Sequence, residues 1–570
     1  MNFRPKALVL QLPAWRSKLL LSVLLVGFFA MLIRAIYLQG INDDFLRQKG
    51  ESRYSKVIEL SAHRGMIFDR NGDPLAVSTP VESVFANPVD VEIDSDQMKE
   101  LAGILKISSR EIDRKLNGKK DFVYLERGIP PEDAAKVLEL RIPGIFLHRE
   151  YRRYYPSGDV MSHIVGFTNL DDKGQEGIEL AYQKELAGSP GSRKVIRDKL
   201  GRAVADVDVI RTPRPGQDLM LSIDSKIQYL AYREIRDAVE KAGAKAGSVV
   251  VLDARTGEVL GMASVPTFNP NNREGLDPGT IRNRAVTDSY EPGSTLKPFT
   301  IAAGLDSGKY TPDSRIDTFG GKLQIGRATI HDDEKMGVLS VTQIIQHSSN
   351  VGASRIALSL PPETMWNMFH NCGFGADPDS GFPGEASGRL RPYQSWRPIE
   401  QATMSFGNGI SVTLLQLARA YTIFANDGVL LPVTFLKRAA LPKGRRVISE
   451  KTAREMVSIL ESVVTPQGTG ARASILGYSV AGKTGTAHKV EGGGYAAHKY
   501  VASFVGFAPA SNPRLIVAVM VDEPSGSRYY GGEVSAPVFS RVMSGSLSIL
   551  NVPADEPQSH YAMNDIRGAM

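Results

Sequence analysis

The chain contains three short motifs in a fixed order: Ser294-Thr295-Leu296-Lys297, Ser348-Ser349-Asn350 and Lys483-Thr484-Gly485-Thr486. Each motif is a weak signal alone, because Ser-x-x-Lys and Ser-x-Asn strings arise by chance in many chains of 570 residues. Their order and the gaps between them carry the information. Such a set is typical of serine acyl-transfer enzymes, in which a lysine activates the nucleophilic serine.

Ser294 and Lys297 have the spacing of a nucleophile and its base on one helix. Glu291-Pro292-Gly293 breaks the chain before Ser294, and apolar residues then recur at helical spacing from Leu296 to Leu305. Ser294 is therefore expected at the N-terminus of a buried helix, where free N–H groups favour negative charge. Lys297 can accept the serine proton only when neutral, and burial or a second nearby cation would lower its pKa. The alternative is a helix-capping serine followed by a solvated lysine.

Ser348 and Asn350 follow a predicted helix over 341–347. Without the flanking motifs, a Ser/Asn-rich helix end would be the default interpretation. His347 lies beside them, but no Asp-His-Ser order fits a catalytic triad, and a lone histidine is more often structural.

Together the three motifs resemble those of the penicillin-binding proteins, over the part of the chain from about residue 218 to 552. The resemblance implies an α/β transpeptidase domain, in which helices flank a central antiparallel sheet. It implies that Ser294 is the nucleophile and Lys297 its base. Ser348 would relay protons, and Asn350 would hydrogen-bond the substrate amide and the lysine.

The third motif lies in a predicted strand. The resemblance implies that Lys483 supplies positive charge and that Thr484 and Thr486 hold a substrate carboxylate. Gly485 leaves room for a ligand lying along the strand, and the backbone N–H groups of Ser294 and Thr486 would form an oxyanion hole. The alternative for Lys483 is a charged residue that protects an exposed sheet edge.

Hydrophobic periodicity predicts the other elements of this domain. They are a strand over 219–223, a helix capped by Asp224, a hairpin of strands 249–252 and 259–262, strands over 501–508 and 515–521, and a closing helix from about 536 to 550. The residues after them, 553–570, are polar and aperiodic and are predicted to be disordered.

Residues 55–215 resemble the β-rich pedestal, or dimerisation domain, of class B penicillin-binding proteins. The resemblance rests on Arg64-Gly65, Asp69-Arg70-Asn71-Gly72, Tyr154-Tyr155-Pro156-Ser157-Gly158 and Gly174-Gln175-Glu176-Gly177-Ile178-Glu179. Met66 to Val77 is predicted to form two strands around an Asn-Gly turn. The polar residues are interpreted as interdomain salt bridges and turn formers, because no paired carboxylates stand in a glycosyltransferase-like setting.

Residues 19–38 form an apolar stretch of about 20 residues, which is long enough to span a membrane once. Lys and Arg are frequent in residues 1–18, whereas Asp43 and Asp44 follow the stretch, so residues 1–18 are predicted to be cytoplasmic. A cleaved signal peptide is the alternative, but the stretch is long for one and no A-x-A-like site follows it. Arg34 could reach the outer interface or contact a partner helix within the membrane.

Composition narrows the class of protein. The hydrophobic and charged fractions of 42% and 23% are ordinary for a globular protein. A net charge of +6 suits a protein beside anionic lipids and wall polymers, but no basic run with interleaved aromatic residues suggests nucleic-acid binding. Cys372 is the single cysteine, which excludes an intramolecular disulfide.

Within class B, the sequence resembles the division-specific branch, the FtsI family. The stretches Ser348–Gly352, Tyr529–Gly532 and Val534–Phe539 carry this resemblance. Leu414 is a departure, because the family commonly has proline there, at a helix start without a catalytic role.

The family also implies a wall of aromatic side chains around the pocket. Tyr500, Tyr529 and Tyr530 stand at the matching positions. Ordinary core packing would explain these tyrosines almost as well.

The resemblance implies a single-pass inner-membrane enzyme that cross-links septal peptidoglycan in the periplasm. Its substrates would be a stem pentapeptide ending in D-Ala-D-Ala and the amine of an acceptor stem, and β-lactams would trap Ser294; no metal or cofactor is implied. The expected partners are a polytopic septal glycosyltransferase and other division proteins.

Two other functions remain open from the sequence. One is a D,D-carboxypeptidase or β-lactamase-type hydrolase. The other is a non-enzymatic penicillin sensor or division scaffold, although a sensor would need a cytoplasmic effector domain and about 18 residues precede the predicted span.

Overall fold

The computed structural model describes residues 14–38, 55–118, 122–197, 203–491, 494–526 and 528–556. The chain divides into two compact units. Unit 1 comprises Met1–Ala62, Pro80–Glu150 and Ser189–Arg214, and unit 2 comprises His63–Thr79, Tyr151–Gly188 and Pro215–Met570. The predicted pedestal over 55–215 is therefore divided between the two units. The predictions for residues 1–13, for Asp43 and Asp44, and for residues 557–570 lie outside the described residues.

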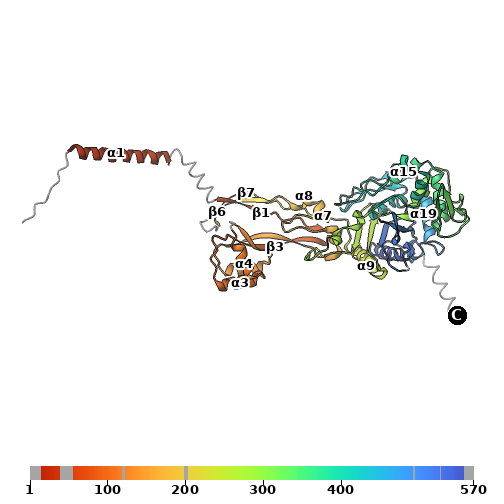
Figure 1. Ribbon diagram of the computed structural model, residues 1–570, viewed down its shortest axis with the longest axis horizontal. Helices are drawn as coiled ribbons and strands as arrows, with labels where there is room; N and C mark the ends of the chain where they lie inside the picture. The colour runs from red at the N-terminus through yellow and green to blue at the C-terminus, as the bar shows by residue number, and fades with distance from the viewer. Residues whose placement is uncertain are drawn as a thin grey trace, which may run out of the picture. The chain divides into compact units, whose positions relative to one another are not determined.

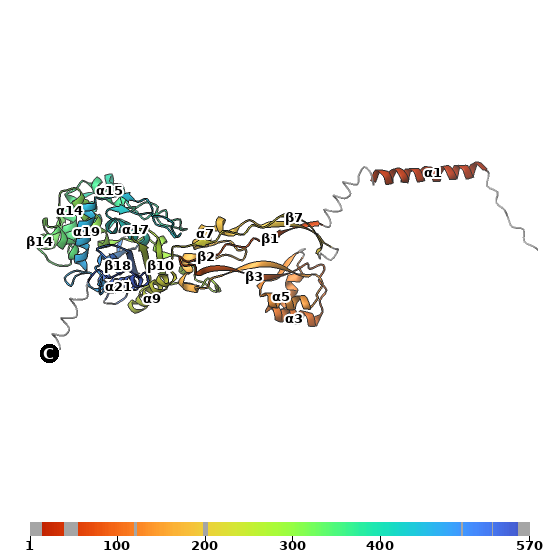
Figure 2. The ribbon, with the colours of Figure 1, turned by 180° about the vertical axis from the view of Figure 1, so that it is seen from behind.

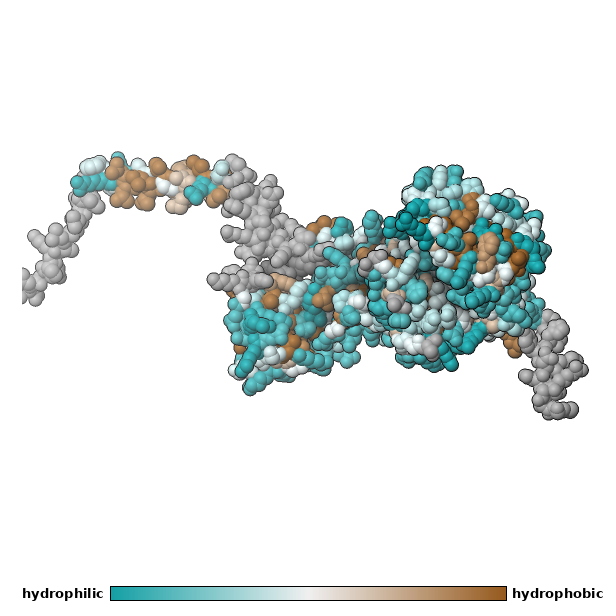
Figure 3. Space-filling view, turned by 45° about the vertical axis from the view of Figure 1, so that its right-hand side comes forward, coloured by the Kyte–Doolittle hydropathy of each residue, from teal (hydrophilic) through white to brown (hydrophobic). Residues whose placement is uncertain are grey.

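Helix α1 (Ala14–Ile36) contains most of the predicted membrane span but begins five residues earlier than its predicted start at residue 19. It has no buried residue, and hydrophobic side chains cover much of its surface (Figure 3). Its length and composition are sufficient to cross a membrane. Arg34 lies in its last turn, close to the end of the apolar stretch.

Unit 1 contains an antiparallel sheet and a small helical core (Figure 1). The sheet has the order β1 (Ser55–Leu60), β6 (Gly191–Arg197) and β7 (Ala203–Arg211). The core is formed by α3 (Ser95–Leu105), α4 (Ser109–Leu116), α5 (Pro131–Glu139) and β4 (Val123–Ile129). Asp94 starts α3 with a capping box, in which its side chain accepts from the N–H of Gln97.

In unit 2, β2 (Ile67–Phe68) pairs with the start of β3 (Pro74–Ala86) around a turn, as predicted. Gly72 has a φ of +96°, which only glycine adopts readily. Strand β8 covers Leu219–Met220 rather than the predicted 219–223. Its partner β2 ends at Phe68, and the next residues pair with another segment: Leu221 forms an isolated bridge with Leu436, and the N–H of Ser222 donates to the carbonyl of Phe435 at 2.8 Å.

A buried ion cluster lies in the N-terminal part of unit 2. Arg64 and Arg153 each approach Glu179 to 2.6 Å, and all three side chains are 1% exposed or less. Burying charges is costly unless further hydrogen bonds compensate, and Arg64 also donates to the Asp172 carbonyl and to Gln183, whereas Nη2 of Arg153 is buried without a hydrogen-bond partner among the described residues. The prediction of an interdomain salt bridge is wrong for Arg64 and Glu179, because both residues belong to unit 2.

A five-stranded antiparallel sheet is the centre of unit 2. Its order is β10 (Val259–Val265), β9 (Ala246–Asp253), β19 (Leu515–Asp522), β18 (Gly494–Ala508) and β17 (Ala481–Glu491). The predicted hairpin and the two predicted C-terminal strands are confirmed, and β17 is an edge strand.

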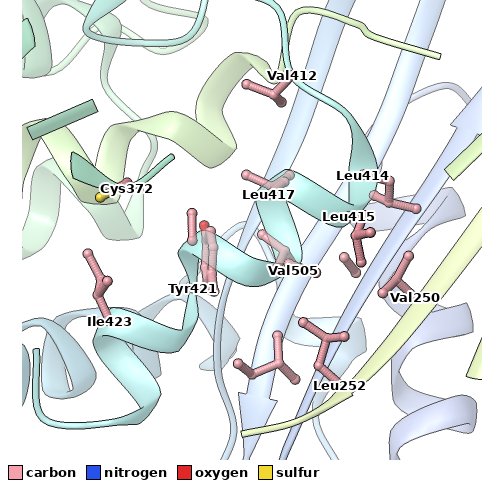
Figure 4. Close-up of a cluster of buried hydrophobic side chains, with 14 of the residues drawn as sticks. Val250, Leu252, Cys372, Val412, Leu414, Leu415, Leu417, Tyr421, Ile423 and Val505 are labelled. Carbon is pink, nitrogen blue, oxygen red and sulfur yellow. The ribbon is translucent and has the colours of Figure 1, made fainter. Parts of the chain in front are cut away.

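Helices cover both faces of this sheet (Figure 2). One face packs against α9 (Ser225–Ala242), which Asp224 caps as predicted, and against the closing helix α21 (Ala536–Ile549). The other face packs against α17 (Leu414–Ala420), whose leucines point toward strand residues such as Val250 and Val505 (Figure 4). Leu414 is buried in this core, so the departure from proline is accommodated by packing.

The remaining helices and strands of unit 2 are shorter or lie outside the sheet. The helices are α6 (Ser162–Val165), α7 (Gly177–Ala181), α8 (Gln183–Ala187), α10 (Pro278–Ile281), α11 (Arg284–Thr287), α12 (Lys297–Asp306), α13 (Val341–Gln346), α14 (Asn350–Leu358), α15 (Pro362–Asn371), α16 (Pro398–Met404), α18 (Thr422–Ala425), α19 (Glu450–Glu461) and α20 (Gly531–Val534). Three two-stranded antiparallel sheets pair β11 (Arg315–Asp317) with β14 (Val338–Ser340), β12 (Lys322–Ile325) with β13 (Ala328–His331), and β15 (Val429–Leu430) with β16 (Arg445–Arg446). Strand β5 (Ile145–Tyr154) and strand β3 each run from one unit into the other.

The chain after α21 stays attached to unit 2 up to Glu556. Asp555 accepts a hydrogen bond from the N–H of Ser479 at 2.9 Å and another from the Ser511 hydroxyl at 2.5 Å. The prediction of a disordered tail is therefore wrong for residues 553–556, because this carboxylate has partners on the folded domain.

Candidate active site

Ser294 lies on a 3₁₀ turn, η3 (Gly293–Leu296), that leads directly into α12. The prediction of a serine at the N-terminus of a buried helix is confirmed, although regular α-helix begins only at Lys297. Gly293 has a φ of +55°, and a Cβ there would lie 3.3 Å from the carbonyl oxygen of Thr486. The turn therefore lies directly against β17.

The three motifs meet at the hydroxyl of Ser348. Its Oγ accepts a hydrogen bond from Lys297 Nζ at 3.1 Å and another from Lys483 Nζ at 3.0 Å. Lys297 Nζ also donates to the carbonyl oxygen of Ser348. Both lysine side chains are 0% exposed, which excludes the solvated lysine and the edge-protecting lysine considered as alternatives.

Burial changes the protonation of both lysines. Loss of solvation lowers the pKa of Lys297 to about 7, and the charges of Asp332 and Asp333 act in the opposite direction. Burial also lowers the pKa of Lys483 well below its ordinary value, and the positive charge of Lys297 lowers it further. A neutral amine is thus accessible near neutral pH on Lys297, three residues after Ser294.

Ser348 has a backbone conformation that is rare for a residue with a side chain. Its φ is +60°, and such a conformation costs on the order of 1–3 kcal/mol unless the surroundings impose it. The next two residues are held by hydrogen bonds. The Ser349 hydroxyl donates to Asp332 at 2.6 Å, and Asn350 Nδ2 donates to the carbonyl of His331 at 3.0 Å.

Strand β17 positions the hydroxyls of the third motif. Thr486 Oγ1 accepts from the N–H of Gly531 at 3.0 Å, which leaves its proton free to donate. Thr484 Oγ1 lies 2.8 Å from the hydroxyl of Thr469 and accepts from Lys483 at 3.3 Å. A ligand carboxylate beside Thr486 would therefore meet a hydroxyl that is already oriented.

The three tyrosines of the predicted aromatic wall form one stack. The rings of Tyr500 and Tyr529 lie 4.2 Å apart, and those of Tyr529 and Tyr530 lie 4.5 Å apart. Tyr530 is 45% exposed and immediately precedes Gly531, whose N–H binds Thr486. The exposure argues against simple core packing, while the contact of these rings with a substrate stays a prediction.

Sequence reasoning missed several residues around Ser294. Glu291 accepts from the N–H of Gly409 at 2.8 Å and from the hydroxyl of Tyr495 at 3.1 Å, and Asn408 also donates to that hydroxyl. Glu291 and Gly409 also line a cavity of about 390 Å³, whose lining, among the described residues, includes no residue of the three motifs. The Gly407-Asn408-Gly409 run was a usable signal, since a Cβ at Gly407 would lie 2.2 Å from the carbonyl oxygen of Gly293.

Comparison with known families agrees with this geometry. Residues 247–544 match the penicillin binding protein transpeptidase domain, and residues 59–221 match the penicillin-binding protein dimerisation domain. The chain belongs to the penicillin-binding proteins. This penicillin-binding protein is 44% identical over 553 residues to the probable peptidoglycan D,D-transpeptidase PenA of Neisseria gonorrhoeae, covering 96% of this chain and 95% of that protein. It is 41% identical over 549 residues to the peptidoglycan D,D-transpeptidase FtsI of Escherichia coli, covering 95% and 93%.

Two solved structures also resemble this chain. The transpeptidase domain of penicillin-binding protein 3 from Burkholderia pseudomallei is 51% identical, with a TM-score of 0.55, and covers 59% of this chain and 98% of that chain. A peptidoglycan synthetase from Bifidobacterium adolescentis has the same fold, with a TM-score of 0.72 over 89% of this chain and 98% of that chain at 24% identity.

Replacing Gly485 by alanine should slow the reaction of Ser294 with a fluorescent penicillin. A Cβ at Gly485 would lie 2.8 Å from Thr295 Cγ2 and 2.9 Å from the Pro292 carbonyl, so it would push the serine turn away from β17. We expect a rate lower by about 10-fold or more, since small displacements of reacting groups are costly. Gly494→Ala is the control, because a Cβ there meets no atom within 4 Å. Equal rates for the two variants would contradict the argument.

The rate of acylation should depend on pH through Lys297. The amine accepts a proton only when neutral, so the rate should rise as the pH increases through about 7 and then level off. Lys297→Arg retains a cation that cannot deprotonate, and it should not be acylated at any pH tested. Stopped-flow measurement of the second-order rate checks this, and a rate that is constant across neutral pH would refute a titrating base.

Proposed function

We propose that this penicillin-binding protein is the D,D-transpeptidase that cross-links the stem peptides of septal peptidoglycan during cell division. The observation that carries the proposal is the meeting of two buried lysines on Ser348 Oγ, beside Ser294 and along an open edge of the sheet. This arrangement provides a base that burial makes neutral and a hydroxyl that can relay a proton, and Ser294 supplies the nucleophile three residues before Lys297. The relatives named PenA and FtsI support the same activity.

In the first half of the reaction, Ser294 Oγ attacks the carbonyl carbon of the penultimate D-Ala. Lys297 takes the serine proton, and the negative charge that develops on the oxygen is stabilised by the N–H groups of Ser294 and Thr486. Ser348 Oγ accepts from both lysines, so its own proton is free to pass to the leaving nitrogen. The C–N bond breaks, D-Ala leaves, and an acyl-enzyme ester remains on Ser294.

Recognition of the donor stem would use the third motif and the aromatic stack. Thr484 and Thr486 would bind the terminal carboxylate, with Lys483 supplying positive charge, and Asn350 would bind the amide of the stem. The expectation that Gly485 leaves room for a ligand is wrong, because a Cβ there would meet Thr295 Cγ2 at 2.8 Å and the Pro292 carbonyl at 2.9 Å, so this glycine makes room for the serine turn. Tyr500, Tyr529 and Tyr530 would cover the apolar parts of the substrate.

In the second half, the amine of an acceptor stem attacks the ester, loses a proton to the base and releases Ser294. A β-lactam imitates the D-Ala-D-Ala end but offers no departing group, so its adduct should persist. A hydrolase would need a carboxylate to activate water. The acids between the second and third motifs include Glu363, Glu385 and Glu400; of these, Glu385 accepts from the N–H of Ser380, and Glu400 pairs with Arg391.

We further propose that α1 anchors the protein in the inner membrane with the N-terminus inside and the catalytic domain in the periplasm. The basic residues before the apolar stretch support this orientation. A polytopic septal glycosyltransferase and other division proteins would be its partners, and Arg34 near the end of α1 is a candidate contact within the membrane. Site-directed cross-linking from α1 in cells tests this, and loss of partners only in Arg34→Leu would identify the contact.

Mass spectrometry should locate a fluorescent penicillin on Ser294, and Ser294→Ala should remove the label. Ser289→Ala is a matched control and should label normally. The adduct should outlast removal of free drug by many minutes, and release of D-Ala from a donor stem should require an acceptor. Turnover of the adduct within seconds would favour a β-lactamase, while D-Ala release without an acceptor would favour a carboxypeptidase.

A fluorescent fusion should gather at division septa, and protease added to spheroplasts should digest the chain beyond α1. The septal position follows from the proposed division role, and the digestion follows from a single membrane helix with its N-terminus inside. Uniform labelling of the side wall would contradict the division role. Protection of the catalytic domain from protease would contradict the orientation.

A further inference from the structure

Asp332 follows β13 directly and belongs to none of the three motifs. Its carboxylate accepts two hydrogen bonds from the second motif, from the Ser349 hydroxyl at 2.6 Å and from the N–H of Val351 at 2.9 Å. Ser349 Oγ in turn accepts from the N–H of Gly352 at 2.8 Å. These bonds satisfy the first turn of α14, where free N–H groups and the helix dipole favour a carboxylate.

Asp332 is itself held in place by backbone contacts. The N–H of Asp332 donates to the carbonyl of Gly321 at 2.9 Å, and a Cβ at Gly321 would lie 3.3 Å from the Asp332 Cβ. Asn350 Nδ2 donates to the carbonyl of His331 at 3.0 Å. The second motif is therefore attached to the β12–β13 hairpin by both a side chain and the backbone.

The bond between Ser349 and Asp332 also constrains Ser348, the residue before Ser349. Ser348 has a φ of +60°, and its carbonyl and hydroxyl oxygens both accept from Lys297. A residue keeps such a conformation only where its neighbours impose it. Fixing Ser349 on Asp332 provides that constraint, because one peptide bond separates Ser349 from Ser348.

We propose that Asp332 is a positioning residue for acylation: its carboxylate holds the Ser348–Asn350 segment against Lys297 and keeps a negative charge close to Lys297. The inference rests on the acylation of Ser294 proposed above. Asp332 acts through Ser349 and through its charge, and it touches neither the substrate nor Ser294 in this scheme.

The charge has a separate effect from the hydrogen bonds. Asp332 and Asp333 both raise the pKa of Lys297, against burial, while Lys483 faces the same space from β17. Removing the charge of Asp332 should therefore let Lys297 become neutral at lower pH. Asp333 is exposed, so solvent screens its charge and it raises the pKa of Lys297 less than Asp332 does. Asp333 therefore serves as the matched control.

Three variants of the full-length protein separate the two effects. Asp332→Asn removes the charge and weakens the clamp, Ser349→Ala removes the clamped hydroxyl but keeps the charge, and Asp333→Asn removes only an exposed charge. The measurement is the second-order rate of acylation by a fluorescent penicillin as a function of pH. The final labelling stoichiometry gives the fraction of competent protein, which corrects each rate for any misfolded molecules.

The expected pattern is specific to a positioning role. In a plot of acylation rate against pH, Asp332→Asn should lower the constant rate reached at high pH (the plateau) by about 10- to 100-fold. It should also move the rising part of the curve (the acidic limb) to lower pH. Ser349→Ala should lower the plateau with the limb unmoved, and Asp333→Asn should keep the plateau within about twofold.

Three results would overturn the inference. They are a wild-type plateau in Asp332→Asn, a slow Asp332→Asn whose limb does not move, and an equal loss in Asp333→Asn. If wild type itself fails to label at Ser294, the proposed function fails instead, so the two failures are distinguishable.

Discussion

Burial of two lysine side chains against one serine hydroxyl is the interaction on which the active site depends. Lys297 and Lys483 are both fully buried, and both donate to Ser348 Oγ. Two ammonium groups in this space would be unfavourable, because each loses its hydration and repels the other. The favourable state has a neutral amine, which is the state that can take a proton from Ser294. The burial that packs Lys297 into the core is therefore also what makes its amine a base.

The edge of the central sheet forms the other wall of the site. An exposed edge strand usually invites unwanted pairing, and proteins protect such edges. Here the serine turn lies against β17, and it can approach because glycines occupy the contacts: a Cβ at Gly293 or Gly485 would press on the opposite backbone. Gly531 continues this pattern, since its N–H binds Thr486 and a Cβ would lie 2.3 Å from the Gly485 carbonyl. These glycines therefore fix how closely the serine turn and the Gly531 segment approach β17.

Several features of the fold were predictable because their signals are local. The cap of α9 at Asp224, the hairpin of β9 and β10, and the helix after Ser294 each follow from side chains within a few residues. Predictions failed where a distant partner decided the outcome. Strand β8 ends early because its partner β2 ends at Phe68, and residues 553–556 stay attached to the domain because Asp555 binds Ser479.

The sequence by itself determined the three motifs, their order and hence the chemistry, because the residue types that perform acyl transfer are few and recur in one arrangement. It could not determine which residues support those motifs. The tertiary structure decided that Lys297 and Lys483 share Ser348, and that Asp332 holds Ser349. It also divided residues 55–215 between two units. The physical reason is that burial, pKa and hydrogen-bond partnership depend on groups far apart in the chain, and only folding brings those groups together.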